Sequence, residues 1–424
     1  MNTLTIKNVG PIKEAVIEIN KVNIFIGPQS SGKSTIAKII SFCFWLEKSV
    51  VLNHGKEHID EKFLYKEIHQ YHDMESYFQE DSSIEYRSDL IVFDFRSVED
   101  FSIDVKNIDE GKNGKIAYIP SERNLVSIPN ISTLDMSYNY IRSFIFDWLL
   151  IHNKYSRTTS FSILDLGINY YYEENKGDVI LLDNNAEIPL SKASSGIQAL
   201  VPLMVYANYA SKWIYENEID LSFDKYESLQ KRLLKLILNQ SKDIENISDE
   251  AIAKAVKLDK IKNSLHTIVS NNNIHNILGD NISGFMERVA KPHFTKLIIE
   301  EPELSIFPRT QYELLKYIFG LLDFNRGDSI VLTTHSPYVM TSINNLIQAS
   351  SSIDEGAEEN MILGITGGVS VKYSDVNAWS IDDGNITNIK DDEYKMISAE
   401  ALDSASDTIS NDYDKLINYA TKQI

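Results

Sequence analysis

The sequence has few of the features that mark secreted or membrane proteins. It has one cysteine, Cys43, which excludes an internal disulfide; because its neighbours predict a helix, we expect it to pack in a core. No run of about 18 apolar residues occurs, so no membrane-spanning helix is predicted. The first residues lack the basic start and apolar centre of a signal peptide. We therefore expect a cytoplasmic protein with no membrane partner.

Basic residues are also scarce. The chain has 41 Lys and Arg against 61 Asp and Glu, and residues 351–424 alone hold 15 acidic and 5 basic side chains. Such a protein is repelled by nucleic acid on average, so nucleic acid is a candidate partner only at a local basic patch. One stretch, residues 225–262, has 9 basic and 6 acidic side chains. It fits such a patch, but the solvated face of two helices is the interpretation that we favour. Its basic members include Lys231, Arg232, Lys235, Lys254, Lys257, Lys260 and Lys262.

The pattern of apolar residues predicts strands and helices in alternation. With 424 residues, the chain can form two or three domains, or one large core with insertions. Helical patterns cover residues 41–80, 131–155, 210–290 and 311–322, and the apolar spacing in 210–290 suits a compact helical hairpin. Strand patterns cover residues 4–6, 15–19, 22–26, 90–93, 115–119, 168–172, 179–182, 296–300, 329–334, 371–373 and 378–381.

A glycine-rich loop is the strongest motif in the sequence. Residues 27–35 match G-x-x-x-x-G-K-[ST], after an apolar run and before a helical stretch. In that context, backbone N–H groups and the helix N-terminus bind a phosphate. We expect Lys33 to reach the β- and γ-phosphates of a nucleoside triphosphate and Ser34 to ligate Mg²⁺. The candidate nucleotide-binding residues are Gly27, Pro28, Gln29, Ser30, Ser31, Gly32, Lys33, Ser34 and Thr35.

Two further strand patterns end in residues suited to phosphate chemistry. The run 296–299 is followed by Glu300, placed to hold Mg²⁺, and by Glu301, placed to polarise a water for attack on the γ-phosphate. The run 329–334 ends at His335, which could contact the γ-phosphate or order that water. We name Glu301 and His335 as candidate catalytic residues and Ser34 and Glu300 as candidate metal ligands.

A serine-rich turn before residues 197–209 allows two interpretations. Ser194, Ser195 and Gly196 could form a second anion site at a helix N-terminus. A serine here could equally be an ordinary helix cap.

A zinc site formed by His54, His58, His69 and His72 is a further alternative, which competes with ordinary surface histidines.

Together these motifs resemble a known family. The phosphate loop, Tyr-Ile-Pro-Ser-Glu-Arg, Ala-Ser-Ser-Gly-Ile-Gln, Ile-Ile-Glu-Glu-Pro-Glu and Thr-Thr-His-Ser-Pro resemble the Walker A, Q-loop, signature, Walker B and switch-histidine motifs of ABC-type ATPases, in the same order. The OLD-like and RecF-like branch is the most similar. The resemblance implies an α/β P-loop NTPase fold of the ABC-ATPase type, with a mixed central sheet, flanking helices, an antiparallel β-subdomain and a helical insertion.

The resemblance also implies how the residues act. The signature residues Ser194 and Gly196, with Ser195 beside them, would contact ATP held by a second copy, so the chain would work as a head-to-tail homodimer or a higher oligomer. Glu122 or Arg123 would approach the metal or water, although no glutamine stands there. Glu300 replaces the usual aspartate, and the aspartate that normally follows Walker B is absent.

The expected organisation has four parts. Residues 1–209 form the first half of the ATPase core, 210–290 a helical insertion, 291–345 the second half, and 346–424 closing strands with an acidic helical tail. Full-length OLD proteins carry a nuclease after the switch histidine, but the 89 residues after His335 show no such pattern. We expect an ATPase that senses or drives anti-phage defence with a separate nuclease or toxin effector. The alternative is a RecF-like or SMC-like repair ATPase that clamps DNA under ATP control.

Overall fold

The computed structural model describes residues 2–217, 291–398 and 410–417. The basic patch at 225–262 and most of the predicted helical insertion lie outside the described residues, as do parts of the predicted acidic tail.

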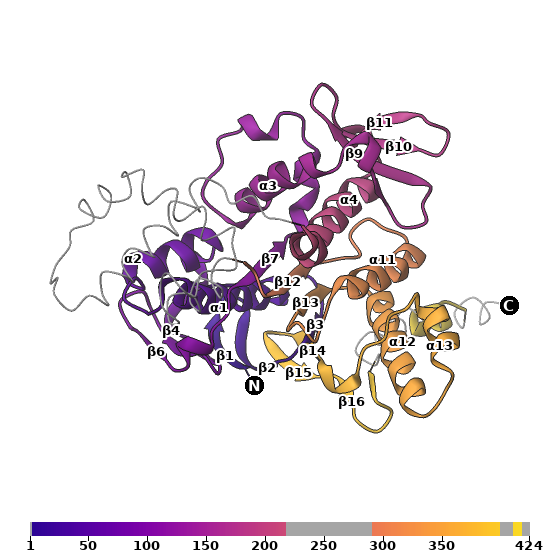
Figure 1. The fold of residues 1–424 in the computed structure, drawn as a ribbon. Helices are drawn as coiled ribbons and strands as arrows, with labels where there is room; N and C mark the ends of the chain where they lie inside the picture. Colours follow the sequence, from indigo (N-terminus) through magenta and orange to yellow (C-terminus); the bar gives the residue numbers. More distant parts are fainter. Residues whose placement is uncertain (1, 218–290, 399–409, 418–424) are drawn as a thin grey trace, which may run out of the picture.

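The predicted α/β fold with a mixed central sheet is confirmed (Figure 1). The described residues form an 11-stranded sheet in the order β6-β5-β4-β1-β2-β15-β14-β3-β13-β12-β7. Five neighbouring strands are parallel: β14 (Val376–Asp382), β3 (Val22–Ile26), β13 (Ser329–Thr334), β12 (Phe294–Glu300) and β7 (Gly114–Ile119). The other strands are β1 (Asn2–Val9), β2 (Ile12–Ile19), β4 (Phe78–Arg87), β5 (Ile91–Phe95), β6 (Phe101–Val105) and β15 (Asn385–Asn388). They pair antiparallel, except that β15 touches β2 in parallel.

The central strands separate two apolar cores. Every residue of β3 and β13 is buried, as expected for parallel strands covered on both faces. Because side chains alternate along a strand, Ile24 faces one core and Phe25 the other. Helix α1 (Lys33–Asn53) fills the core that contains Phe25. The opposite core is filled by α3 (Tyr140–Ile151), α4 (Ser195–Asn208), α11 (Pro308–Leu321) and α12 (Pro337–Asp354).

Smaller elements surround this sheet. The predicted hairpin forms part of a separate four-stranded antiparallel sheet, whose last strand precedes α4 (Figure 1). Its strands are β8 (Phe161–Ser162), β9 (Ile168–Glu173), β10 (Gly177–Leu182) and β11 (Glu187–Pro189). The remaining α-helices and strands of the described ranges are α2 (Glu61–Leu64), α5 (Ile214–Glu216), α13 (Glu359–Thr366), β16 (Lys390–Asp391), β17 (Met396–Ile397) and a helix over 410–417. None of the helices in the described ranges combines the length and apolar character needed to cross a membrane.

Two predicted segments differ from the structure. Residues 371–373 were expected to form a strand, but the N–H of Val371 bonds the Leu346 carbonyl at 3.0 Å, and a 3₁₀ turn, Tyr373–Asp375, follows. The second predicted closing strand exists as β14, yet it lies inside the sheet between β3 and β15. The C-terminal part of the chain therefore completes the central sheet.

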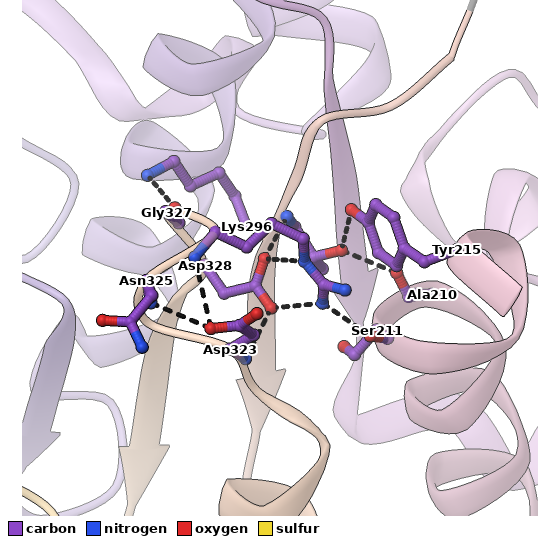
Figure 2. Close-up of polar contacts among 10 residues, drawn as sticks. Ala210, Ser211, Tyr215, Lys296, Asp323, Asn325, Gly327 and Asp328 are labelled. Carbon is purple, nitrogen blue, oxygen red and sulfur yellow. Dashed lines mark hydrogen bonds and ion pairs between the residues drawn. The ribbon is translucent and has the colours of Figure 1, made fainter.

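A polar cluster fixes the start of β12 and β13 (Figure 2). The Asp328 carboxylate is fully buried; it accepts the Thr295 N–H at 2.8 Å and forms an ion pair with Arg326 at 2.5 Å. Arg326 also donates to the Ser211 carbonyl at 2.7 Å and lies 3.5 Å over the Tyr215 ring. Thr295 donates to the Ala210 carbonyl and contacts the Tyr215 hydroxyl at 2.8 Å. We call Ala210, Ser211, Tyr215, Thr295, Arg326 and Asp328 the Asp328 cluster; it ties residues 210–215 to the sheet.

Candidate active site

The phosphate loop, the paired glutamates and the histidine meet at one edge of the sheet. Strand β13 lies between β3 and β12, and all three run parallel. The register pairs Thr334 with Ile26 and Thr333 with Glu300, so the three strands end together. The carboxyl ends of parallel strands form the crevice where α/β proteins bind ligands. This edge is therefore the candidate active site.

The loop after β3 requires glycine at two positions. A Cβ on Gly27 would lie 2.2 Å from the carbonyl oxygen of Ile381 in β14. Gly32 has φ 108°, and a Cβ there would lie 2.3 Å from Ile12 Cδ1. The loop thus packs tightly against two other strands and delivers the N-terminus of α1 at Lys33. Free N–H groups at a helix start, together with the helix dipole, favour a bound phosphate.

The Lys33 side chain lies within this loop. Its Nζ donates to the carbonyls of Gly27 at 2.9 Å and Pro28 at 2.6 Å, and to Ser31 Oγ at 3.4 Å. Burial lowers the pKa of Lys33 to about 8, while the nearby carboxylate of Glu301 acts in the opposite direction. The loop is therefore shaped around a buried ammonium, the group that suits a phosphate oxygen.

Ser34 and Glu300 meet as the metal-site prediction requires. Ser34 Oγ donates to Glu300 Oε2 at 2.8 Å. The other carboxylate oxygen of Glu300 accepts a hydrogen bond from the Tyr118 hydroxyl of β7. Burial raises the pKa of Glu300. A hydroxyl and a carboxylate side by side are hard oxygen donors, so the residues present fit Mg²⁺. The contact of Tyr118 could not be predicted, because its partner Glu300 lies 182 residues further along the chain.

Glu301 and His335 form the second pair. His335 Nε2 lies 3.2 Å from Glu301 Oε1, and both side chains are partly exposed, at 23% and 30%. Glu301 has a positive φ of 44°, which turns the chain sharply at the end of β12. Its N–H bonds the Thr333 carbonyl at 2.9 Å. A carboxylate beside an imidazole at the rim of a phosphate loop can accept a proton from a water.

Glu303 supports the histidine, a role that was not predicted from the sequence. Its Oε1 accepts the N–H of His335 at 2.6 Å and the hydroxyl of Thr334 at 2.8 Å. Ser336 in turn donates to Gln311 Oε1 at 2.7 Å. These bonds hold the turn between β13 and α12, and with it the histidine backbone. Glu303 belongs to the Glu-Glu-Pro-Glu run, and this run was the feature of the sequence that could have indicated its role.

The serine-rich turn lies at the start of α4, and the structure does not bring it to the other predicted residues. Ser194 is the residue before the helix, but its side chain forms no capping hydrogen bond, and Ser194 and Ser195 are exposed. A Cβ on Gly196 would lie 2.6 Å from the Ser305 carbonyl oxygen, so the turn packs against the loop after β12. Within the described ranges, no hydrogen bond joins these three residues to Lys33 or Glu301.

The two residues at the predicted Q-loop position have different surroundings. Glu122 is bonded to Ser121 at 3.1 Å and to the Tyr140 hydroxyl at 3.4 Å. Arg123 is buried, and its guanidinium donates to four backbone carbonyls, two of them those of Glu300 and Glu301. Arg123 thus holds the backbone that carries the acids. It stays a prediction that Glu122 or Arg123 approaches the metal or the water.

The zinc alternative is wrong. His58 Nε2 bonds Ser49 Oγ at 2.7 Å, and His72 is buried, which lowers its pKa to about 3. The ring of His69 packs edge-on against Phe78. No cluster of three or more metal-ligating side chains occurs in the part of the chain that the structure describes.

Known structures with a similar arrangement come from several ATPase groups. The SMC head domain from Thermotoga maritima is 13% identical, with a TM-score of 0.36 over 91% of this chain and 97% of that chain. The recombination mediator protein RecF is 13% identical, with a TM-score of 0.28 over 91% and 97%. An ATP-binding cassette of an ABC transporter, in its ADP conformation, is 11% identical, with a TM-score of 0.28 over 93% of both chains.

A family assignment comes from the sequence. Comparison with curated proteins gives no match. The family model described as AAA domain matches residues 3–273, well over half of the chain. The matched region includes the phosphate loop, β7 and α4. The chain therefore belongs to the AAA-domain family of P-loop ATPases.

Proposed function

We propose that this protein binds ATP with Mg²⁺ and hydrolyses it to ADP and phosphate. The observation that carries the proposal is the pairing of Ser34 with Glu300 at 2.8 Å and of Glu301 with His335 at 3.2 Å, at the ends of neighbouring strands. The first pair has the chemistry of a Mg²⁺ site and the second that of a general base.

Each group then has a defined task. Lys33 and the loop N–H groups bind the β- and γ-phosphates, and Ser34 and Glu300 hold Mg²⁺, which neutralises phosphate charge when bound. Glu301 accepts a proton from the attacking water as the water oxygen bonds to the γ-phosphorus. The bond from that phosphorus to the β–γ bridging oxygen breaks, and ADP leaves with the electron pair. His335 orients the Glu301 carboxylate throughout.

We propose further that two copies complete the site head to tail. Ser194 and Ser195 are exposed at the start of α4 and form no helix-capping bond, so their hydroxyls can face another molecule. Two aromatic side chains near the acids are also exposed, Phe307 at 74% and Tyr338 at 52%. Exposed aromatic residues of this kind are typical of protein interfaces. The resemblance to ABC-type ATPases supports the same arrangement.

Mixing two inactive variants tests the composite site. Lys33→Ala is expected to remove nucleotide binding, and Ser194→Arg to block contact with the partner's nucleotide. Each variant alone should show no turnover. In a mixture, heterodimers contain one undamaged site, so ATPase activity should return. Activity that does not return would contradict the head-to-tail dimer. Lys62→Ala, an exposed lysine elsewhere, is the control and should behave as wild type.

The resemblance to OLD-like ATPases supports a biological setting. We propose that the chain is the sensor or motor subunit of a prokaryotic anti-phage system with a separate nuclease or toxin effector. Cells that carry the gene and its neighbours should resist phage, and Lys33→Ala should abolish resistance. Equal resistance in that variant would refute the setting. Tight, ATP-dependent and salt-sensitive DNA binding without resistance would favour the RecF-like alternative instead.

A further inference from the structure

Arg123 is a buried cation with an unusual set of partners. Its side chain is 1% exposed. Nη1 donates to the carbonyls of Pro120 at 3.1 Å and Glu300 at 2.7 Å; Nη2 donates to the Glu301 carbonyl at 2.7 Å, and Nε to the Ala199 carbonyl at 3.1 Å. Within the described ranges, no carboxylate oxygen lies at ion-pair distance from it. Burying a guanidinium is costly unless its N–H groups are bonded, and here backbone oxygens bond them.

These four carbonyls belong to three separate elements. Pro120 follows β7, Glu300 is the last residue of β12 with Glu301 directly after it, and Ala199 lies in the second turn of α4. One side chain therefore joins the end of the acid-bearing strand to the helix that begins at the serine-rich turn.

The bond to the Glu301 carbonyl falls where the backbone is strained. Glu301 has φ 44°, a conformation that costs free energy for a residue with a side chain and persists only when its surroundings fix it. Three bonds do so: the Glu301 N–H donates to the Thr333 carbonyl, and the Glu301 carbonyl accepts both the Leu304 N–H at 3.0 Å and the Arg123 guanidinium at 2.7 Å. This turn directs the Glu301 carboxylate toward His335, at 3.2 Å.

We propose that Arg123 is a positioning residue for the general base: it holds Glu301 through its backbone and fixes that position relative to α4. The proposal rests on the proposed ATPase function. It assigns Arg123 no contact with nucleotide, metal or water. Arg123 acts on the reaction because a shift of about 1 Å in a catalytic group can lower a rate about 100-fold.

A variant series with a matched control tests the assignment. Arg123→Met removes the guanidinium and keeps most of the volume, Arg123→Lys keeps the charge, and Arg123→Ala leaves room for added guanidinium ion. Arg326→Met is the control, because Arg326 also donates to a backbone carbonyl but at the opposite end of β12. For each protein, kcat, the Kd for Mg²⁺-ATP and the melting temperature are measured.

We expect Arg123→Met to lower kcat about 100-fold while the Kd changes less than about threefold. Arg123→Lys should recover only part of kcat, since an ammonium cannot span the two carbonyls of Glu300 and Glu301. Low-millimolar guanidinium should raise kcat of Arg123→Ala, whereas equal sodium chloride should not. Arg326→Met should lower the melting temperature and leave kcat of the folded protein unchanged.

Three results would overturn the assignment. The first is an unchanged kcat in Arg123→Met. The second is a loss of kcat that follows the loss of folded protein, or that Arg326→Met shares. The third is a parallel loss of nucleotide affinity, which would make Arg123 a binding residue. Failure of the ATPase function itself is distinguishable, because wild type would then show no turnover, or Glu301→Gln would turn over normally.

Discussion

The two ends of β12 each carry an arginine network, and the two networks differ in burial and in charge balance: Arg123 is buried, whereas the Arg326 side chain is 21% exposed. At the start of the strand, Arg326 pairs with the fully buried carboxylate of Asp328. At its end, the partners of Arg123 among the described residues are four backbone carbonyls. A balanced ion pair with all its bonds satisfied ties elements together, and breaking it destabilises the fold. A guanidinium bonded to carbonyls next to acids can instead fix the backbone on which those acids sit.

The start of β12 thus contributes to the stability of the fold, and its end to the proposed reaction. The Asp328 cluster joins residues 210–215 to the sheet. Its member in β12, Thr295, lies five residues before Glu300. The Arg123 network lies at the acids themselves. We therefore expect changes at the first site to alter the free energy of unfolding and changes at the second to alter turnover.

The largest effect expected at the start of the strand comes from Asp328→Asn. The change leaves Arg326 without its carboxylate and should lower the free energy of unfolding by about 3 kcal/mol, measured by urea denaturation. The kcat of the folded protein should not change. A tenfold lower kcat, measured where all of the variant is folded, would contradict the distinction between the two ends of β12.

A smaller effect is expected from Tyr118→Phe at the other end. The change removes the hydrogen bond to Glu300 Oε1, and Ser34 is then the one side chain among the described residues that still bonds this carboxylate. We expect the Mg²⁺ concentration needed for half-maximal ATP binding to rise about tenfold, since one bond to a charged group contributes about 1.5–3 kcal/mol. Tyr155→Phe is the control, because its hydroxyl bonds Asn208 instead. Equal Mg²⁺ requirements in both variants would argue against the metal site.

The smallest effect is expected from Thr295→Val. The substitution keeps the shape but loses the hydrogen bonds to the Ala210 carbonyl and the Tyr215 hydroxyl. A loss of about 1 kcal/mol in unfolding free energy is expected by thermal or urea denaturation, with kcat and nucleotide affinity intact. A changed kcat in this variant would mean that the contacts at the start of β12 also affect the position of the acids at its end.

The fold class was predicted correctly from the sequence, and the structure brings several of the predicted site residues together. Each motif followed an apolar strand pattern, and parallel strands bring such ends together, so Ser34 and Glu300 could be expected to meet. The place of β14 inside the sheet could not be predicted, because its pattern fits a closing hairpin equally well. The roles of Tyr118 and Arg123 also escaped prediction. Their partners lie more than 170 residues away or are backbone carbonyls, which carry no sequence signal.

The most direct test of the central claim is ATP turnover and ATP binding in Glu301→Gln. The amide cannot accept the proton from water, so kcat should fall at least about 1,000-fold if Glu301 is the general base. The Kd for Mg²⁺-ATP should stay near that of wild type, and ATP should hold the variant as a dimer in light-scattering measurements. Glu393→Gln, an exposed glutamate, should match wild type. Turnover in Glu301→Gln at the wild-type rate would contradict the assignment of Glu301 as the base.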